Sequence, residues 1–571
     1  LVSDTIIYSM SDRTPKIKQA PRMRNGKKVM ASTGWERLIW VRFVGESREK
    51  TVLRLRAHAP GFGRGQEKAV IAFGKSGFNN RKGLNVVRNL TIEIEEGNPG
   101  AVGIDFTGAN SASISNVTIR AAADSGLAGI LIHRPPVLAY MADISIDGFD
   151  YGIWTRVGHA TVPVFDHISI TNPHRAGVRI SDKREDDGGQ GPPLLILRHL
   201  NYRGATPLAE LTHPQGYLIL TDSEARATSV QPALLERKSP HGTVLLQHVK
   251  IDGFQRLYSG GAVRNGNDMA SDIAFLCISG AQEQALHRPS LLLQPFQEPP
   301  PLPWPDDPSQ WTTPEAFGAK ADGKTDDTAA FQRALNSGKP YLFLTGTGYH
   351  VSSPLQVPAT VTMIDGMFRW NPQLHFIVSE ASDRPLWLVD VFRGNLTIDA
   401  PRHVIRHMCQ IGVSTTERAR GGLLTLLGGS YPRSKKNPAR IRVQGWAVNN
   451  EGKGLPIRIE DTKAWILGLK TERGPVLHLR DAQAQVLGTI IGVHTPERGA
   501  IVIESSRLLF SGLKSAGPWP GDIRPVSMID SHGSRDILPE GSILNPDTNG
   551  KNRYFPVFPL FEADTTGDSA R

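Results

Sequence analysis

The chain is poor in the residues and segments that define several common classes of protein. Its 571 residues include only two cysteines, Cys277 and Cys409, which lie in different halves. A disulfide framework is therefore excluded, and no Cys-x-x-Cys pair exists to hold zinc. We expect both thiols to be buried as small hydrophobic groups. No apolar run approaches 18 residues, which predicts that no helix spans a membrane.

The first ten residues lack the features of a secretory signal. They contain Asp4, and they show no charged stretch followed by an apolar one. A signal was therefore either removed or never present, and the sequence leaves both alternatives open.

Motifs of the common enzyme classes are missing as well. The sequence has no Gly-x-Ser-x-Gly elbow, no Walker phosphate loop and no His-Glu-x-x-His zinc helix. Its 17 histidines are dispersed without the spacing of metal ligands, so we predict neither a metal site nor a cofactor. The net charge of +10 is compatible with an anionic partner. Lys and Arg are scattered, however, and no nucleic-acid-binding motif accompanies them, so we expect no nucleic-acid partner.

Glycine and proline are abundant, with 57 and 41 residues, while hydrophobic residues make up only 39% of the chain. This mixture favours many short strands joined by turns over long helices. The chain is also longer than one hydrophobic core usually organises, so we expect two domains.

A four-residue segment that starts with Asn, Asp or His recurs through the first half of the chain. Successive copies start 27, 27, 24, 32 and 49 residues apart, and the last gap is about two periods. Each copy alternates apolar and polar residues, as a strand with one buried face does. One strand every two dozen residues, without helical patterns between, indicates a solenoid whose coils stack the first residues into a ladder at a turn. The copies are 89–92, 116–119, 143–146, 167–170, 199–202 and 248–251.

The second half has two ladders of its own. Both step by 20 and then by 24 residues, which indicates stacked coils again. The first ladder comprises 457–461, 477–481 and 501–505, and the second comprises 467–469, 487–489 and 511–513.

A proline-rich segment separates the halves. Residues 289–311 hold eight prolines, which disfavour both sheet and helix and predict a stiff extended linker. The chain therefore divides into a first β-helix at 1–288, this linker, and a second β-helix at 312–571. One segment, 325–335, has the apolar spacing of a helix with Thr or Asp at its start, and a helix there would cover the open end of the second solenoid.

The segment 317–328, Phe-Gly-Ala-Lys-Ala-Asp-Gly-Lys-Thr-Asp-Asp-Thr, resembles the opening motif of the pectate-lyase-like β-helix superfamily, and Gly-Tyr-His-Val at 348–351 resembles the pattern that follows it. The resemblance implies an all-β fold of two tandem right-handed single-stranded parallel β-helices, with a capping helix at the start of the second. The first half lacks the motif, and residues 1–6 resemble those that follow Tyr349. We therefore expect the cap of the first β-helix to be missing from the chain.

Two linked β-helices of this type resemble glycoside hydrolase family 55, whose members are β-1,3-glucanases with paired solenoids. The closest local match is Trp-Ile-Leu-Gly-Leu-Lys-Thr-Glu at 465–472. The resemblance implies hydrolysis of a laminarin-type glucan in a cleft between the β-helices, with Glu472 as the general acid. Glu451 lies 21 residues earlier, about one coil away, and is a second candidate for a catalytic carboxylate.

Three further residues near these carboxylates are predicted to bind substrate: Trp446, as a face on which a sugar ring stacks, Lys470 and Arg473. Two other functions stay open. A polysaccharide lyase acting on an acidic glycan would use a basic group such as Lys470 or Arg473 to abstract a proton. A non-catalytic glycan-binding solenoid would release no product. In each case the expected partner is a polysaccharide or oligosaccharide, and we expect a monomer in an extracellular or periplasmic location.

Overall fold

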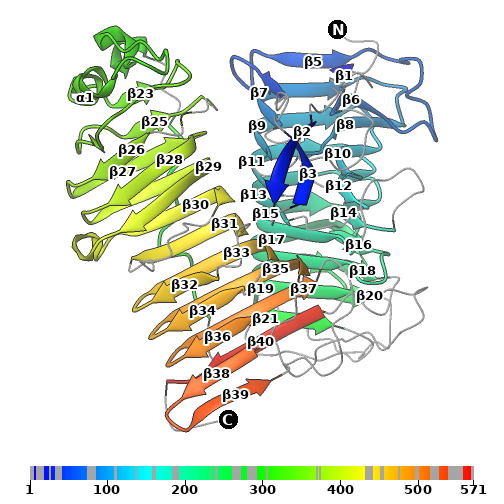
Figure 1. Cartoon of the computed structure of the whole chain (residues 1–571). Coiled ribbons are helices and arrows are strands. Elements are labelled where there is room, and N and C mark those ends of the chain that lie inside the picture. The colour runs from blue at the N-terminus through cyan, green and yellow to red at the C-terminus, as the bar shows by residue number, and fades with distance from the viewer. Residues whose placement is uncertain are drawn as a thin grey trace.

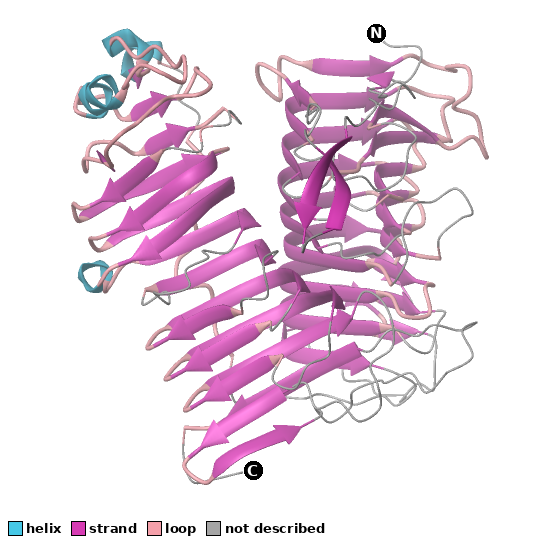
Figure 2. Cartoon of the chain, viewed as in Figure 1, coloured by secondary structure: helices cyan, strands magenta, loops and turns pink. Residues whose placement is uncertain are grey.

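The computed structural model shows an all-β protein with very little helix (Figure 2). Among the described residues, no helix is long and apolar enough to cross a membrane. The described residues are 6–7, 19–24, 27–32, 41–73, 85–108, 112–134, 138–156, 162–182, 192–231, 233–237, 242–259, 272–279, 292–303, 307–367, 371, 374–430, 441–450, 456–473, 476–494, 500–514, 526–537 and 557–566.

The fold is a right-handed parallel β-solenoid, and its strands form two stacks that lie side by side (Figure 1). The strands up to Ser279, which we call the N-terminal stack, form two long sheets. One sheet contains β4 (Arg42–Val44), β5 (Val52–Leu55), β7 (Val86–Ile94), β9 (Ala112–Ala121), β11 (Leu138–Asp147), β13 (Val162–Thr171), β15 (Leu194–Gly204), β17 (Tyr217–Gln231), β19 (Thr243–Phe254) and β21 (Asp272–Ser279). The other contains β1 (Ile6–Ile7), β6 (Lys68–Ala72), β8 (Ala101–Asp105), β10 (Ala128–Ile132), β12 (Tyr151–Thr155), β14 (Ala176–Ile180), β16 (Ala209–Leu211), β18 (Leu235–Arg237) and β20 (Tyr258–Ser259).

The strands from Trp311 onward, which we call the C-terminal stack, pair only with one another among the described strands. A long sheet contains β22 (Trp311–Thr312), β23 (Tyr341–Phe343), β24 (Leu355–Gln356), β25 (Met363–Asp365), β26 (His375–Val378), β27 (Ser382–Val389), β28 (Phe392–Ile398), β29 (Arg402–Thr415), β30 (Leu423–Ser430), β31 (Arg442–Asn450), β33 (Lys463–Arg473), β35 (Gln483–His494), β37 (Arg507–Lys514) and β40 (Val557–Asp564). A shorter one contains β32 (Ile457–Glu460), β34 (Leu477–Arg480), β36 (Ile501–Glu504), β38 (Val526–Asp530) and β39 (Gly533–Ile537). A separate hairpin joins β2 (Gln19–Arg24) to β3 (Lys27–Ser32).

The repeat predicted in the first half is confirmed. The segments that begin at 116, 143 and 167 lie on neighbouring parallel strands, with Val117 opposite Ile144 and Ile144 opposite Ile168. The first residue of each copy has a left-handed backbone with φ between 48° and 56°, which bends the strand, and Asn, Asp and His accept this conformation better than most residues. The long gap between the last two copies is two periods, because Asp222 supplies the missing bend with φ 49°.

Side chains also form the predicted ladder at this bend. Asn116 Nδ2 donates a hydrogen bond of 2.9 Å to Asn89 Oδ1 one coil away. The two ladders of the second half are confirmed as well, because Ile457, Leu477 and Ile501 are register partners, and so are Leu467 and Leu487.

Each stack has its own apolar core, and a third apolar cluster joins the two stacks. This third cluster packs outward-facing residues of β11, β13 and β15 against those of β30, β31, β33 and β35. Both cysteines are buried, as predicted, and Cys277 belongs to the joining cluster. Burial of such side chains stabilises the contact by about 1.5–3 kcal/mol for each large apolar group.

The proline-rich segment runs between the stacks. Its residues 292–303 contain neither helix nor strand, whereas Pro308–Gln310 form a 3₁₀ turn and Trp311 begins β22. Glutamines of the C-terminal stack hold its backbone. Phe296 N donates to Gln444 Oε1 at 2.8 Å, and Leu293 N donates to Gln485 Oε1 at 2.9 Å. The linker is thus a packed layer between the stacks.

The predicted helix is present as α1 (Thr328–Leu335), which starts three residues later than expected and lies beside the first strands of the C-terminal stack (Figure 1). Asp326 Oδ1 accepts from the first helical amide, Thr328 N, at 3.0 Å. The carboxylate of Asp327 instead accepts from Lys320 N at 2.7 Å, so this residue ties the preceding loop. Within the described part of the chain there are also three short 3₁₀ turns: Pro308–Gln310, Glu315–Phe317 and Glu417–Ala419.

Candidate functional site

A cavity of about 780 Å³ lies where the two stacks and the linker meet. Its walls come from the N-terminal stack, from linker residues 298–302 and from three strands of the C-terminal stack. It is lined by Arg48, Ser115, Asn116, Tyr140, Ala142, Asp143, Ile144, Ser145, Asp166, His167, Ile168, Ser169, His199, Asn201, Glu298, Pro299, Pro300, Pro301, Leu302, Trp387, His407 and Leu427.

The bends of the N-terminal ladder supply the polar side of the cavity. Asn116, Asp143, His167 and His199 occupy the bend position on four successive coils. Because the coils stack about 4.8 Å apart, residues separated by two dozen positions or more become neighbours on one wall. Equivalent positions of the sequence repeat therefore form a row of polar side chains on this wall.

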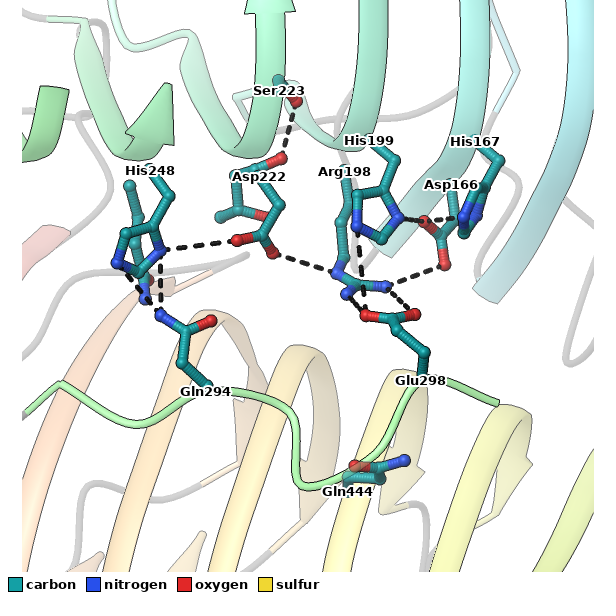
Figure 3. Close-up of polar contacts among 12 residues, drawn as sticks. Asp166, His167, Arg198, His199, Asp222, Ser223, His248, Gln294, Glu298 and Gln444 are labelled. Atoms are coloured by element: carbon teal, nitrogen blue, oxygen red, sulfur yellow. Dashed lines mark hydrogen bonds and ion pairs between the residues drawn. The ribbon is translucent and has the colours of Figure 1, made fainter. Parts of the chain in front are cut away.

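Asp166, the residue before the bend at His167, lies between His167 and His199 and is 1% exposed (Figure 3). Its Oδ2 accepts from Tyr140 OH at 3.2 Å and from Arg198 Nη1 at 3.4 Å. Its Oδ1 lies 3.1 Å from His167 Nδ1 and 3.2 Å from His199 Nδ1. Burial alone would raise the pKa of Asp166, but the two imidazoles and the charge of Arg198 lower it below its usual range, so the group is a carboxylate.

Arg198 connects the three parts of the molecule. Its guanidinium pairs with Asp166, with Asp222 at 3.2 Å, and with Glu298 of the linker. It also lies over the ring of Trp446 in the C-terminal stack, 5.1 Å from the ring centroid. Burial lowers the pKa of Arg198, but the surrounding carboxylates raise it more, so the side chain keeps its charge.

Two further groups of the cavity have shifted pKa values. Contact with the Asp166 carboxylate raises the pKa of His167. Removal of water raises the pKa of Asp143, although His167 and Arg48 oppose this shift. The wall therefore presents carboxyl and imidazole groups whose protonation depends on one another.

None of the site residues predicted from the sequence is among the residues that line this cavity. Some of them are buried in other places, and the side chains of the others are not described. Glu451 lies outside the described residues. Glu472 and Arg473 belong to β33, but their side chains are not among those described. Lys470, on the same strand, is fully buried and does not line the cavity.

The prediction that a sugar ring stacks on Trp446 does not agree with the structure. Its side chain has no exposed surface, because the ring packs 5.1 Å from that of Trp465 and against Arg198. Because the ring has no exposed surface, a sugar cannot stack on it. In this structure Trp446 belongs to the contact between the stacks.

The cluster around Asp166 was not predicted, although the sequence carried a signal for it. The repeat aligns His167 with His199, and the residues before them, Asp166 and Arg198, are register partners that interrupt apolar runs. A charged residue at a buried position of a strand needs an opposite charge or a hydrogen-bond partner. Two such residues on neighbouring strands therefore indicate a buried polar cluster.

The search against family models and the search of curated proteins gave no match to the chain. Function is therefore inferred from the site itself.

Proposed function

We propose that the protein is a polysaccharide-degrading glycoside hydrolase that cuts a β-1,3-glucan in the cavity between the stacks. The stacks would then be tandem β-helices of the pectate-lyase-like type, with α1 as the cap of the second. A monomer in an extracellular or periplasmic location belongs to the same proposal. The observation that carries it is the inter-stack cavity, because two residues with carboxyl groups from different parts of the chain, Asp143 and Glu298, both line it.

The size and the polar lining of the cavity support this proposal. Its volume of about 780 Å³ falls within the range of pockets that hold small organic ligands, roughly 300–1,000 Å³. Ser145, Ser169 and Asn201 offer hydrogen-bonding groups on successive coils. On the facing stack the lining includes Trp387 and Leu427, whose side chains are otherwise buried in the cluster that joins the stacks.

Hydrolysis of a glycosidic bond needs one carboxyl group to protonate the leaving oxygen and a second to activate water or attack the sugar. Glu298 pairs with the guanidinium of Arg198, and a carboxylate held by a cation suits the second role. Asp143, on β11, is then the candidate proton donor. Glu472 remains a rival donor that rests on the family resemblance alone.

The test is product chromatography on a small panel of β-glucans with three variants. We expect Asp143→Asn to lower the release of reducing sugar roughly 100-fold or more, as loss of a general acid does. Asp147→Asn is the matched control, because Asp147 ends the same strand and accepts from Thr171 and Asn172 outside the cavity. Full activity in Asp143→Asn together with an inactive Glu472→Gln variant would move the acid to Glu472. Absence of product from every glucan would overturn the proposal.

A second candidate, a polysaccharide lyase, is favoured by the cationic groups of the cavity. Arg48 and His167 line the cavity and would neutralise the carboxylate of a uronate and assist proton abstraction next to it. Ultraviolet absorbance of an unsaturated product on polyuronates would identify this reaction. Retention of a glycan without any product would instead indicate a binding protein.

A further inference from the structure

We propose that Asp166, His167 and His199 bind one divalent transition-metal ion of the zinc class at the wall of the cavity. Each of the three side chains offers one ligand atom, and these atoms all lie within 4.8 Å of one another. The inference concerns metal binding and does not depend on whether a glycan is cut.

The distances suit a tetrahedral ion. Bonds of about 2.0–2.1 Å from zinc to imidazole nitrogen and carboxylate oxygen place neighbouring ligand atoms roughly 3.3 Å apart. Asp166 Oδ1 lies 3.1 Å from His167 Nδ1 and 3.2 Å from His199 Nδ1. The two imidazole rings are 4.3 Å apart between centroids, so both approach the carboxylate from adjacent coils.

The two oxygens of Asp166 have different surroundings. Tyr140 and Arg198 both donate to Oδ2, which orients the carboxylate as outer-shell partners orient metal ligands. Oδ1 is buried and lies 3.1–3.2 Å from Nδ1 of both histidines, and its contact with His199 Nδ1 lacks the geometry of a hydrogen bond. The three atoms thus converge closely without satisfying one another fully, which suits the binding of a cation among them.

The charges around the site also fit a dication. Three carboxylates, from Asp166, Asp222 and Glu298, surround the single guanidinium of Arg198 and leave two negative charges. One divalent ion or two protonated imidazoles would balance them. Neutral imidazoles are the form that binds metal, so these two possibilities exclude each other.

Three protein ligands leave one position of a tetrahedral ion open, as in catalytic zinc sites. Because all three ligand residues line the cavity, that position is accessible to water or to an oxygen of a bound molecule. The ion would thus take part in binding whatever enters the cavity.

The experiment is titration of the chelator-treated full chain with Zn²⁺ by calorimetry, and with Co²⁺ by visible absorption. We expect one ion per chain and the intense absorption of tetrahedral Co²⁺. His167→Ala and His199→Ala should each weaken binding roughly 100-fold, and Tyr140→Phe about tenfold, as loss of an outer-shell partner does.

His248→Ala is the matched control. His248 occupies the same bend of the ladder and lies 3.4 Å from Asp222, but it does not belong to the three-residue group. Its loss should leave both titrations unchanged. Absence of stoichiometric binding, or equal affinity in the His167, His199 and His248 variants, would overturn the proposal. The titrations measure metal binding and not activity on glycans. A negative result in them is therefore distinct from a failure of the hydrolase proposal.

Discussion

At the scale of single residues, one backbone conformation serves both the fold and the site. The left-handed bend selects Asn, Asp or His, because their short polar side chains tolerate positive φ. Between the coils of Asn89 and Asn116 this choice gives an amide ladder. On the coils that face the other stack the same position carries Asp143, His167 and His199, which therefore line the cavity.

Removal of Arg198 tests the buried cluster. Arg198→Met would leave Asp166 buried without its cation, which typically costs about 3–5 kcal/mol of folding free energy. Chemical denaturation measures this loss. Arg203→Met, on the exposed face of the same strand, should change the free energy of unfolding by less than about 0.5 kcal/mol. Equal effects of the two substitutions would show that the cluster contributes nothing to stability.

Asp390 makes stability depend on pH. Burial raises its pKa well above the usual range, although Arg88 of the facing stack, 3.7 Å away, opposes the shift. A carboxyl group with a raised folded pKa contributes stability that is fully present below its unfolded pKa of about 4. That stability is lost as the pH rises through the folded pKa.

Asp390→Asn should therefore flatten the decline of stability above about pH 4. Denaturation midpoints measured across a series of pH values give the two slopes. Parallel slopes in the wild type and the variant would mean that Asp390 does not titrate as stated.

At the scale of elements, the strands were predictable because their signal is local. The alternation of apolar and polar residues and the bend residue lie within a single coil, and the period is the spacing from one coil to the next. The copies at 116–119 and 143–146 can therefore be aligned without a structure. The prolines of 289–311 are a local signal as well, and residues 292–303 contain neither helix nor strand. The helix boundary was less predictable, because Asp327 binds loop amides through its side chain.

Glycines at the bends of the C-terminal stack have a second role that the sequence could not reveal. Gly468 and Gly488 have positive φ, and they also face the N-terminal stack. A Cβ atom at Gly468 would lie 2.6 Å from Val162 and 2.8 Å from Val164. Close contact between the stacks therefore requires glycine there.

Gly468→Ala should lower the free energy of unfolding by about 1–3 kcal/mol more than Gly338→Ala. The control, Gly338, has a φ of 78°, but a Cβ atom there would meet no other atom within 4 Å, so it isolates the backbone cost of about 1–2 kcal/mol. Denaturation of both variants measures the difference. Equal losses would mean that the stacks do not approach each other at this glycine.

At the scale of the whole molecule, the candidate site exists only where three distant parts of the chain meet. Arg198 and Glu298 are 100 residues apart, and Gln247 and Gln485, which hydrogen bond across the stacks, are 238 apart. No period within one half predicts how the halves face each other. Local patterns therefore point to residues such as Glu451 and Trp446, whereas Asp143 and Glu298 become candidates only through the contact between the stacks.

The most direct test of the inter-stack cavity as the glycan site is to fill it. Ser145→Trp places a large ring in the cavity, whereas Thr118→Trp places one at the register partner on the preceding coil, which does not line the cavity. Product release from β-glucans would be compared for both variants, with circular dichroism to verify folding. We predict that only Ser145→Trp loses product release. Full activity in folded Ser145→Trp would contradict a glycan site between the stacks.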